Sequence, residues 1–113
     1  MSNYTEINIK LGMPSVVDAI ADLKSSLERC KKNKFKCVLI IHGYGSTVKG
    51  GAIQKKARQW LLAQKRNGKL KAVEFGENFS IFNFNALELK NRYKELEVLM
   101  NVHNEGVTVV EFW

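Results

Sequence analysis

The most constraining feature of the sequence is an unbroken apolar run, Cys37–Ile41, that ends abruptly at His42 and Gly43. Three of its five residues are β-branched, which suits an extended strand. A strand that is apolar at consecutive positions is typically buried on both faces, as the inner strands of parallel sheets are. The run therefore predicts a parallel, central strand, and the rest of the chain has to cover it.

Strand-like and helix-like patterns precede this run. Residues 4–11 alternate between apolar and polar side chains, which predicts a half-buried strand. Ser15 and Asp18 then resemble a capping box, in which side chains bond the free amides at a helix start. The apolar stripe of the helix that follows consists of Val16, Ile20, Leu23, Leu27 and Cys30.

A second helix follows the run. Its apolar stripe is Ile53, Ala57, Trp60 and Leu61, so we interpret Trp60 as a packing residue. Its expected outer face carries Lys55, Lys56, Arg58 and Lys65. The pair Asn67-Gly68 closes the helix, and Leu70–Phe75 is expected to be a third strand.

The last third of the chain is less regular. We expect an aromatic plug over the core, formed by Phe79, Ile81, Phe82 and Phe84. A short helix is expected around residues 86–96, and Val107–Trp113 alternates as a final strand. The order βαβαβ(α)β predicts one α/β domain over residues 1–113, with right-handed crossovers.

Charge is distributed unevenly along the chain, whose net charge is +7 over 113 residues. No acidic residue interrupts the segment between Lys49 and Lys71, whereas acids gather in the first helix and near the end of the chain. One face of the molecule should therefore be strongly positive, which favours polyanionic partners. The basic residues of this segment are Lys49, Lys55, Lys56, Arg58, Lys65, Arg66, Lys69 and Lys71.

Several classes of protein are disfavoured. No apolar run approaches the roughly 20 residues that span a bilayer, and residues 1–10 lack the regions of a signal peptide, so we expect a cytoplasmic protein with no membrane partner. Two cysteines, Cys30 and Cys37, make no disulfide framework and are expected to be reduced. No metal site and no cofactor are expected from the residue spacing.

The glycine-rich turn after the apolar run is the candidate site. In open α/β sheets ligands bind at the carboxyl ends of the strands, and the amides of a helix start favour an anion such as phosphate. His42 can bond a phosphate oxygen or act as an acid or base, and Tyr44 can stack on a base. The glycines that let the backbone approach a ligand are Gly43, Gly45, Gly50 and Gly51.

The turn matches neither the nucleoside-triphosphate loop Gly-X4-Gly-Lys-Ser/Thr nor the dinucleotide fingerprint Gly-X-Gly-X-X-Gly. A tight turn that binds no ligand is the competing interpretation. The basic helix that follows the turn weighs against it.

These residues resemble a known family. The stretch Ile40-Ile41-His42-Gly43-Tyr44-Gly45, followed by Gly50-Gly51 and an amphipathic helix, is similar to the small MutS-related (Smr) domain, and the likeness extends over nearly the whole chain. It implies a two-layer α/β sandwich with a four-stranded mixed sheet, like the C-terminal domain of translation initiation factor three. Smr domains bind DNA or RNA, and several cut it.

One motif of that family is absent. The Leu-Asp-X-His-Gly motif aligns with Ile9-Lys10-Leu11-Gly12-Met13, so Lys10 replaces its acid and Gly12 its histidine. A lysine and a glycine cannot bind a metal or move protons as that pair can. Lys10 adds a phosphate partner instead, so the resemblance supports binding more than cutting.

We therefore expect a DNA- or RNA-binding domain, with a monomer favoured. The expected binding residues are Lys10, His42, Gly43, Tyr44, Gly45, Lys49, Gly50, Gly51, Lys55, Lys56 and Arg58. One alternative is an endonuclease with His42 as its acid or base, for which alone a divalent metal is expected. A second alternative is a protein-interaction domain with a basic face.

Overall fold

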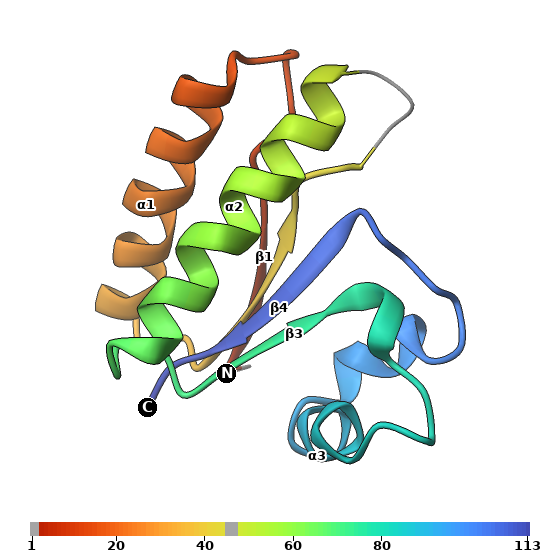
Figure 1. Cartoon of the computed structure of the whole chain (residues 1–113). Helices are drawn as coiled ribbons and strands as arrows, with labels where there is room; N and C mark the ends of the chain where they lie inside the picture. Colours follow the sequence, from red (N-terminus) through yellow and green to blue (C-terminus); the bar gives the residue numbers. More distant parts are fainter. Residues whose placement is uncertain (1–2, 45–47) are drawn as a thin grey trace.

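The apolar run forms an inner strand, β2, of a four-stranded sheet in the computed structural model, which describes residues 3–44 and 48–113. The strand order is β1-β2-β4-β3 (Figure 1). In chain order the elements are β1 (Tyr4–Asn8), α1 (Val16–Lys32), β2 (Cys37–Ile41), α2 (Val48–Arg66), β3 (Ala72–Phe75), the 3-10 turn η1 (Gly76–Asn78), α3 (Phe84–Arg92), the 3-10 segment η2 (Lys94–Leu99) and β4 (Val107–Glu111).

The sheet is mixed, as the resemblance implied. Strand β2 runs parallel to β1 and antiparallel to β4, with Leu39 opposite Val109. Strand β3 pairs antiparallel with β4. The central position of β2 is thus confirmed, and its parallel pairing holds on the β1 side only.

Both faces of the inner strands are covered, which explains their continuous apolar sequence. Helices α1 and α2 pack on one face, where Leu23, Ile40 and Leu61 belong to one core cluster. Helix α3 and η2 cover the other face, where Leu39 and Leu89 belong to a second cluster. The two main helices make the expected two-layer sandwich, and the segment before β4 adds cover on the opposite side (Figure 1).

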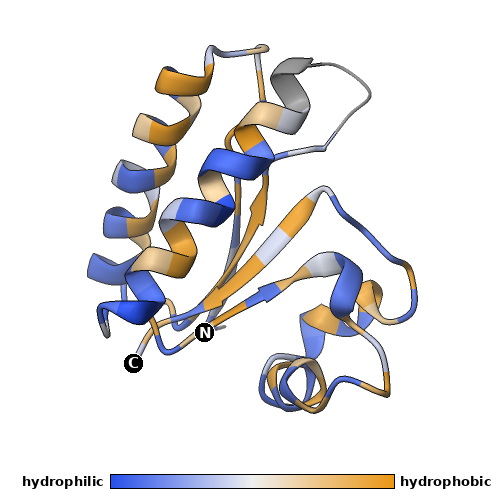
Figure 2. Cartoon of the chain, in the orientation of Figure 1, coloured by the Kyte–Doolittle hydropathy of each residue, from blue (hydrophilic) through white to orange (hydrophobic). Residues whose placement is uncertain are grey.

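The predicted start of α1 and the predicted end of α2 are confirmed. The Ser15 hydroxyl accepts a hydrogen bond from the amide of Asp18 at the start of α1. Gly68 has a φ of +76° after α2, and its amide donates to the Lys65 carbonyl, so the chain can reverse there. Figure 2 shows that the last turns of α1 and α2 are hydrophilic, whereas β2 is hydrophobic.

The prediction of an aromatic plug is wrong for three of its four residues. Phe79 is buried, but Ile81, Phe82 and Phe84 are 62%, 92% and 72% exposed. The chain turns at this point, and the Asn83 side chain caps α3 by accepting from the amide of Ala86. Ala86 and Leu89 within α3 therefore reach the core instead of the side chains of residues 81, 82 and 84.

Three strands are shorter than expected, and one of them is β4, which ends at Glu111 instead of at Trp113. Strand β1 ends at Asn8 instead of at Leu11, because Gly12 and Met13 both have positive φ and turn the chain toward α1. Leu11 is consequently exposed. Strand β3 begins at Ala72, two residues after the predicted start. No helix in the described part of the chain is both long and apolar enough to cross a membrane.

An ion pair between the buried carboxylate of Glu111 and the exposed side chain of Arg92 joins β4 to the covering layer on the second face. Glu111 is 2% exposed, and its carboxylate accepts two hydrogen bonds of 2.9 Å from Arg92 and one of 2.7 Å from the Tyr93 hydroxyl. Burial raises the pKa of the Glu111 carboxyl, but these hydrogen bonds outweigh it and the pKa is lowered overall.

We expect Arg92→Met to destabilise the protein by about 2 kcal/mol at pH 7, because the buried carboxylate of Glu111 loses two charged hydrogen bonds. A lowered carboxyl pKa contributes stability above about pH 4.5 that is lost as the pH falls through the folded-state pKa. In the variant this loss of stability on acidification should be smaller, because without Arg92 the folded-state pKa of Glu111 rises toward that of the unfolded chain. Urea unfolding between pH 3 and 7 measures both effects. Arg66→Met, at an exposed position of α2, is the control and should change little.

Candidate functional site

The turn that follows β2 is fixed against the residue that precedes β4. The amides of His42 and Gly43 both donate to the carbonyl of Gly106, at 3.0 Å each. Gly43 has a φ of +69°, a conformation that side chains disfavour. A Cβ at this position would also lie 3.1 Å from Cδ of Lys10, so the Lys10 side chain lies close to the turn.

The imidazole of His42 is part of the buried structure. The residue is 0% exposed, its Nδ1 lies 2.7 Å from the Gly43 carbonyl oxygen, and its Nε2 lies 2.8 Å from the Thr108 hydroxyl. A carbonyl oxygen only accepts, so the network assigns the proton to Nδ1, and Nε2 accepts from Thr108. Burial lowers the pKa of His42 to about 4, so the ring is neutral near pH 7.

Arg58 extends this network from α2. Its Nε donates to the Thr108 hydroxyl at 2.9 Å, and its two terminal nitrogens donate to the Glu77 carboxylate at 2.8 and 2.7 Å. The guanidinium also lies 4.0 Å from the centre of the Phe75 ring. These contacts leave 11% of the side chain exposed.

The prediction that Arg58 lies on the outer face of α2 is therefore wrong. A guanidinium forms paired hydrogen bonds with a carboxylate and stacks on aromatic rings, and Glu77 and Phe75 at the end of β3 supply both partners. Burial raises the pKa of the Glu77 carboxyl, but the hydrogen bonds from Arg58 lower it overall. The positive charge of Arg58 is thus compensated within the protein.

Sequence analysis missed Thr108 and the role of Glu77. Together they complete a continuous polar chain, Glu77–Arg58–Thr108–His42–Gly43, that joins η1, the middle of α2, the start of β4 and the end of β2. A signal for Thr108 was present, because it is a single polar residue inside the apolar sequence Val107-Thr108-Val109-Val110. A buried hydroxyl at such a position needs a partner.

Other expected site residues remain accessible beside the turn. Tyr44 is 51% exposed, and Lys10, Lys55 and Lys56 are exposed. Carbons of the Lys10 side chain lie against Gly43, so the structure brings Lys10 to the turn. A Cβ at Gly51 would be in ordinary contact, 3.6 Å from the Tyr44 carbonyl oxygen.

Three of the expected site residues lie wholly or partly outside the part of the chain that the structure describes. Gly45 lies outside the described residues, and so does the side chain of Lys49. The backbone of Lys49 and of Gly50 belongs to the first turn of α2. Within residues 3–44 and 48–113, no three His, Cys, Asp or Glu side chains gather where they could hold a metal ion.

We expect Thr108→Val to lower the free energy of unfolding by about 2 kcal/mol, because the methyl group leaves Arg58 Nε and His42 Nε2 without their buried partner. Urea unfolding measures the change. Thr5→Val, on the edge strand β1, is the matched control. An equal effect of both substitutions would contradict a special role of the Thr108 hydroxyl.

His42 should also give stability a pH dependence. Its pKa of about 4 in the folded protein lies below the ordinary value of 6.5, so the unfolded chain binds the proton first as the pH falls. Stability should be constant above about pH 7 and decrease between about pH 6.5 and 4, by at most about 1.4 kcal/mol per pH unit. Urea unfolding of His103→Gln, in which His42 is the remaining histidine, measures this. Equal stability at pH 7 and pH 5.5 would show that the ring titrates normally.

Comparisons with known proteins bear on the family and the fold of the chain. The Smr domain model matches residues 11–78, which is more than half of the chain. No curated protein matches the sequence. The crystal structure of the Smr domain of MutS2 from Thermus thermophilus superposes with a TM-score of 0.57 at 17% identity, over 96% of this chain and 98% of that one. At this identity the superposition shows a shared fold, and the family match shows that the chain belongs to the Smr domain family.

Proposed function

We propose that this chain binds nucleic acid through the turn after β2 and the outer face of α2. The observation that carries the proposal is the pair of exposed lysines, Lys55 and Lys56, on the helix that begins beside the turn. No acidic residue between Lys49 and Lys71 opposes them. Membership of the Smr family, whose members generally bind or nick nucleic acids, supports the proposal.

The position of the turn in the sheet supports an anion at this place. Helices α1 and α2 both begin at the edge where β1 and β2 end (Figure 1). The first amides of a helix lack partners within it and point toward any anion there. Lys10 lies against Gly43, so it can contact the same phosphate as the amides of the turn.

The polar chain suggests how the other expected residues act. Because both ring nitrogens of His42 are bonded and the residue is buried, we assign His42 to holding the turn in shape. Arg58 is neutralised by Glu77 and is assigned to the same support. The exposed Tyr44 ring offers a surface for a base. This division favours binding over acid–base chemistry by His42.

We expect Lys55→Gln/Lys56→Gln to weaken binding about tenfold at low salt, because two phosphate contacts are removed. The dependence of log affinity on log salt for duplex DNA should become shallower by about 2 units, at roughly 0.9 unit per contact. Fluorescence anisotropy with labelled duplex DNA, single-stranded DNA and RNA over a range of salt measures both effects.

The matched control is Lys90→Gln/Lys94→Gln, which removes the same charge from the layer on the opposite face of the sheet. It should retain nearly wild-type binding. An equal loss in both variants would mean that only net charge matters. Absence of binding to all three nucleic acids at low salt would overturn the proposal and favour an acidic protein partner.

A further inference from the structure

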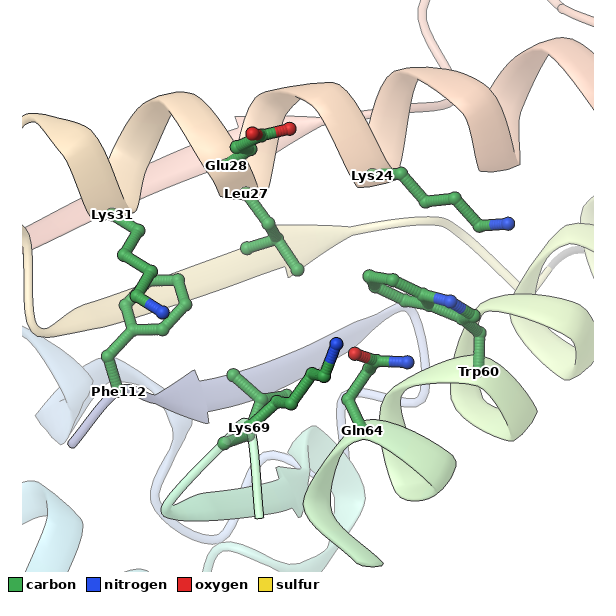
Figure 3. Close-up of a pocket in the computed structure, with 9 residues that line it drawn as sticks. Lys24, Leu27, Glu28, Lys31, Trp60, Gln64, Lys69 and Phe112 are labelled. Atoms are coloured by element: carbon green, nitrogen blue, oxygen red, sulfur yellow. The ribbon is translucent and has the colours of Figure 1, made fainter. Parts of the chain in front are cut away.

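A groove between α1 and α2 lies away from the turn after β2. It has a volume of about 300 Å³ and is lined by side chains from both helices and from the residues that flank β3 and β4 (Figure 3). This volume is at the lower end of the range for small-molecule sites, which suits one nucleotide-sized ligand. Trp60 lies nine residues after Gly51 along α2, or about 14 Å at 1.5 Å per residue.

The inner wall of the groove is apolar and partly aromatic. Leu27, Leu70 and Phe112 are buried members of the core cluster that line it, and Trp60 packs against the same cluster while remaining partly exposed. Figure 3 shows Lys24 of α1 and Trp60 of α2 facing each other across the groove, where Lys24 Nζ lies 5.7 Å from the centre of the indole ring. A flat aromatic ligand would find a stacking surface here.

The rim of the groove is positively charged. Lys24, Lys31 and Lys69 line it, against the single carboxylate of Glu28. Among the ion pairs of the described residues, none involves these three lysines. Three ammonium groups and one carboxylate leave the rim with a net positive charge beside an indole ring, which suits a ligand that combines an aromatic ring with negative charge. A base with its attached phosphates has this combination.

We propose that this groove binds one unpaired nucleotide, with its base against Trp60 and its phosphates on Lys24, Lys31 and Lys69. The choice of a nucleotide rests on the function proposed above. A nucleotide site in the groove limits that function to single-stranded nucleic acid, because the bases of a duplex are stacked on one another and cannot enter the groove. A strand that contacts the turn would reach Trp60 after about four nucleotides at the stacked rise of ~3.4 Å.

The test uses the Trp113→Phe protein, in which Trp60 is the remaining tryptophan. Its fluorescence is followed during titration with a single-stranded octanucleotide, an abasic octamer of equal charge, an eight-base-pair duplex and a nucleoside monophosphate. The octanucleotide should quench Trp60 and bind at least tenfold more tightly than the abasic octamer. Lys24→Gln/Lys69→Gln should reduce both effects, whereas the control Lys90→Gln/Lys94→Gln should not.

The outcomes separate the groove from the turn. Equal affinity for the octanucleotide and the abasic octamer, with no change in Trp60 fluorescence, would overturn the groove site and leave nucleic-acid binding intact. Saturable quenching by the monophosphate without binding of any oligomer would support a site for free nucleotides and overturn the function proposed for the turn. Failure of every probe to bind would overturn both proposals.

Discussion

Burial of the two inner strands on both faces is the constraint on which the rest of the structure depends. Helices α1 and α2 cover one face of β2 and β4, and α3 with η2 covers the other. Any polar side chain on these strands is therefore removed from water and must find a partner inside the protein. Thr108 and Glu111 of β4 both do so, and no buried side-chain nitrogen or oxygen atom of the described residues lacks a hydrogen-bond partner.

The same constraint shapes the turn after β2. His42 leaves the sheet still buried, so its ring must be bonded, and Thr108 and the Gly43 carbonyl supply the two bonds. Arg58 completes the chain and is neutralised by Glu77. The supporting groups thus carry little free charge, and the positive field of this surface arises from exposed lysines such as Lys55 and Lys56. In the proposed function, the lysines therefore contact phosphates and the polar chain holds the turn beneath them.

Helix α2 links the turn to the groove. Its first turn follows the His42–Tyr44 segment, its inner face reaches the core through Ile53 and Leu61, and Trp60 lies at the groove. Burial holds the helix against the sheet, so the proposed phosphate surface and the proposed base site keep a constant separation. One flexible single strand of sufficient length can therefore occupy both proposed sites at once. A duplex cannot, because it has no unpaired base to place in the groove.

The amino-acid sequence by itself determined the element order, the central strand, the Ser15 cap, the Gly68 helix end and the basic run, because local periodicity and backbone preference encode them. It did not determine which side chains near the ends of elements face the core. Phe82 is exposed and most of the Arg58 side chain is covered, against their hydropathy, because the Asn83 cap sets the start of α3 and Glu77 lies within reach of α2. Only the tertiary structure decided these positions, since each depends on a partner distant in sequence or on the direction of a neighbouring element.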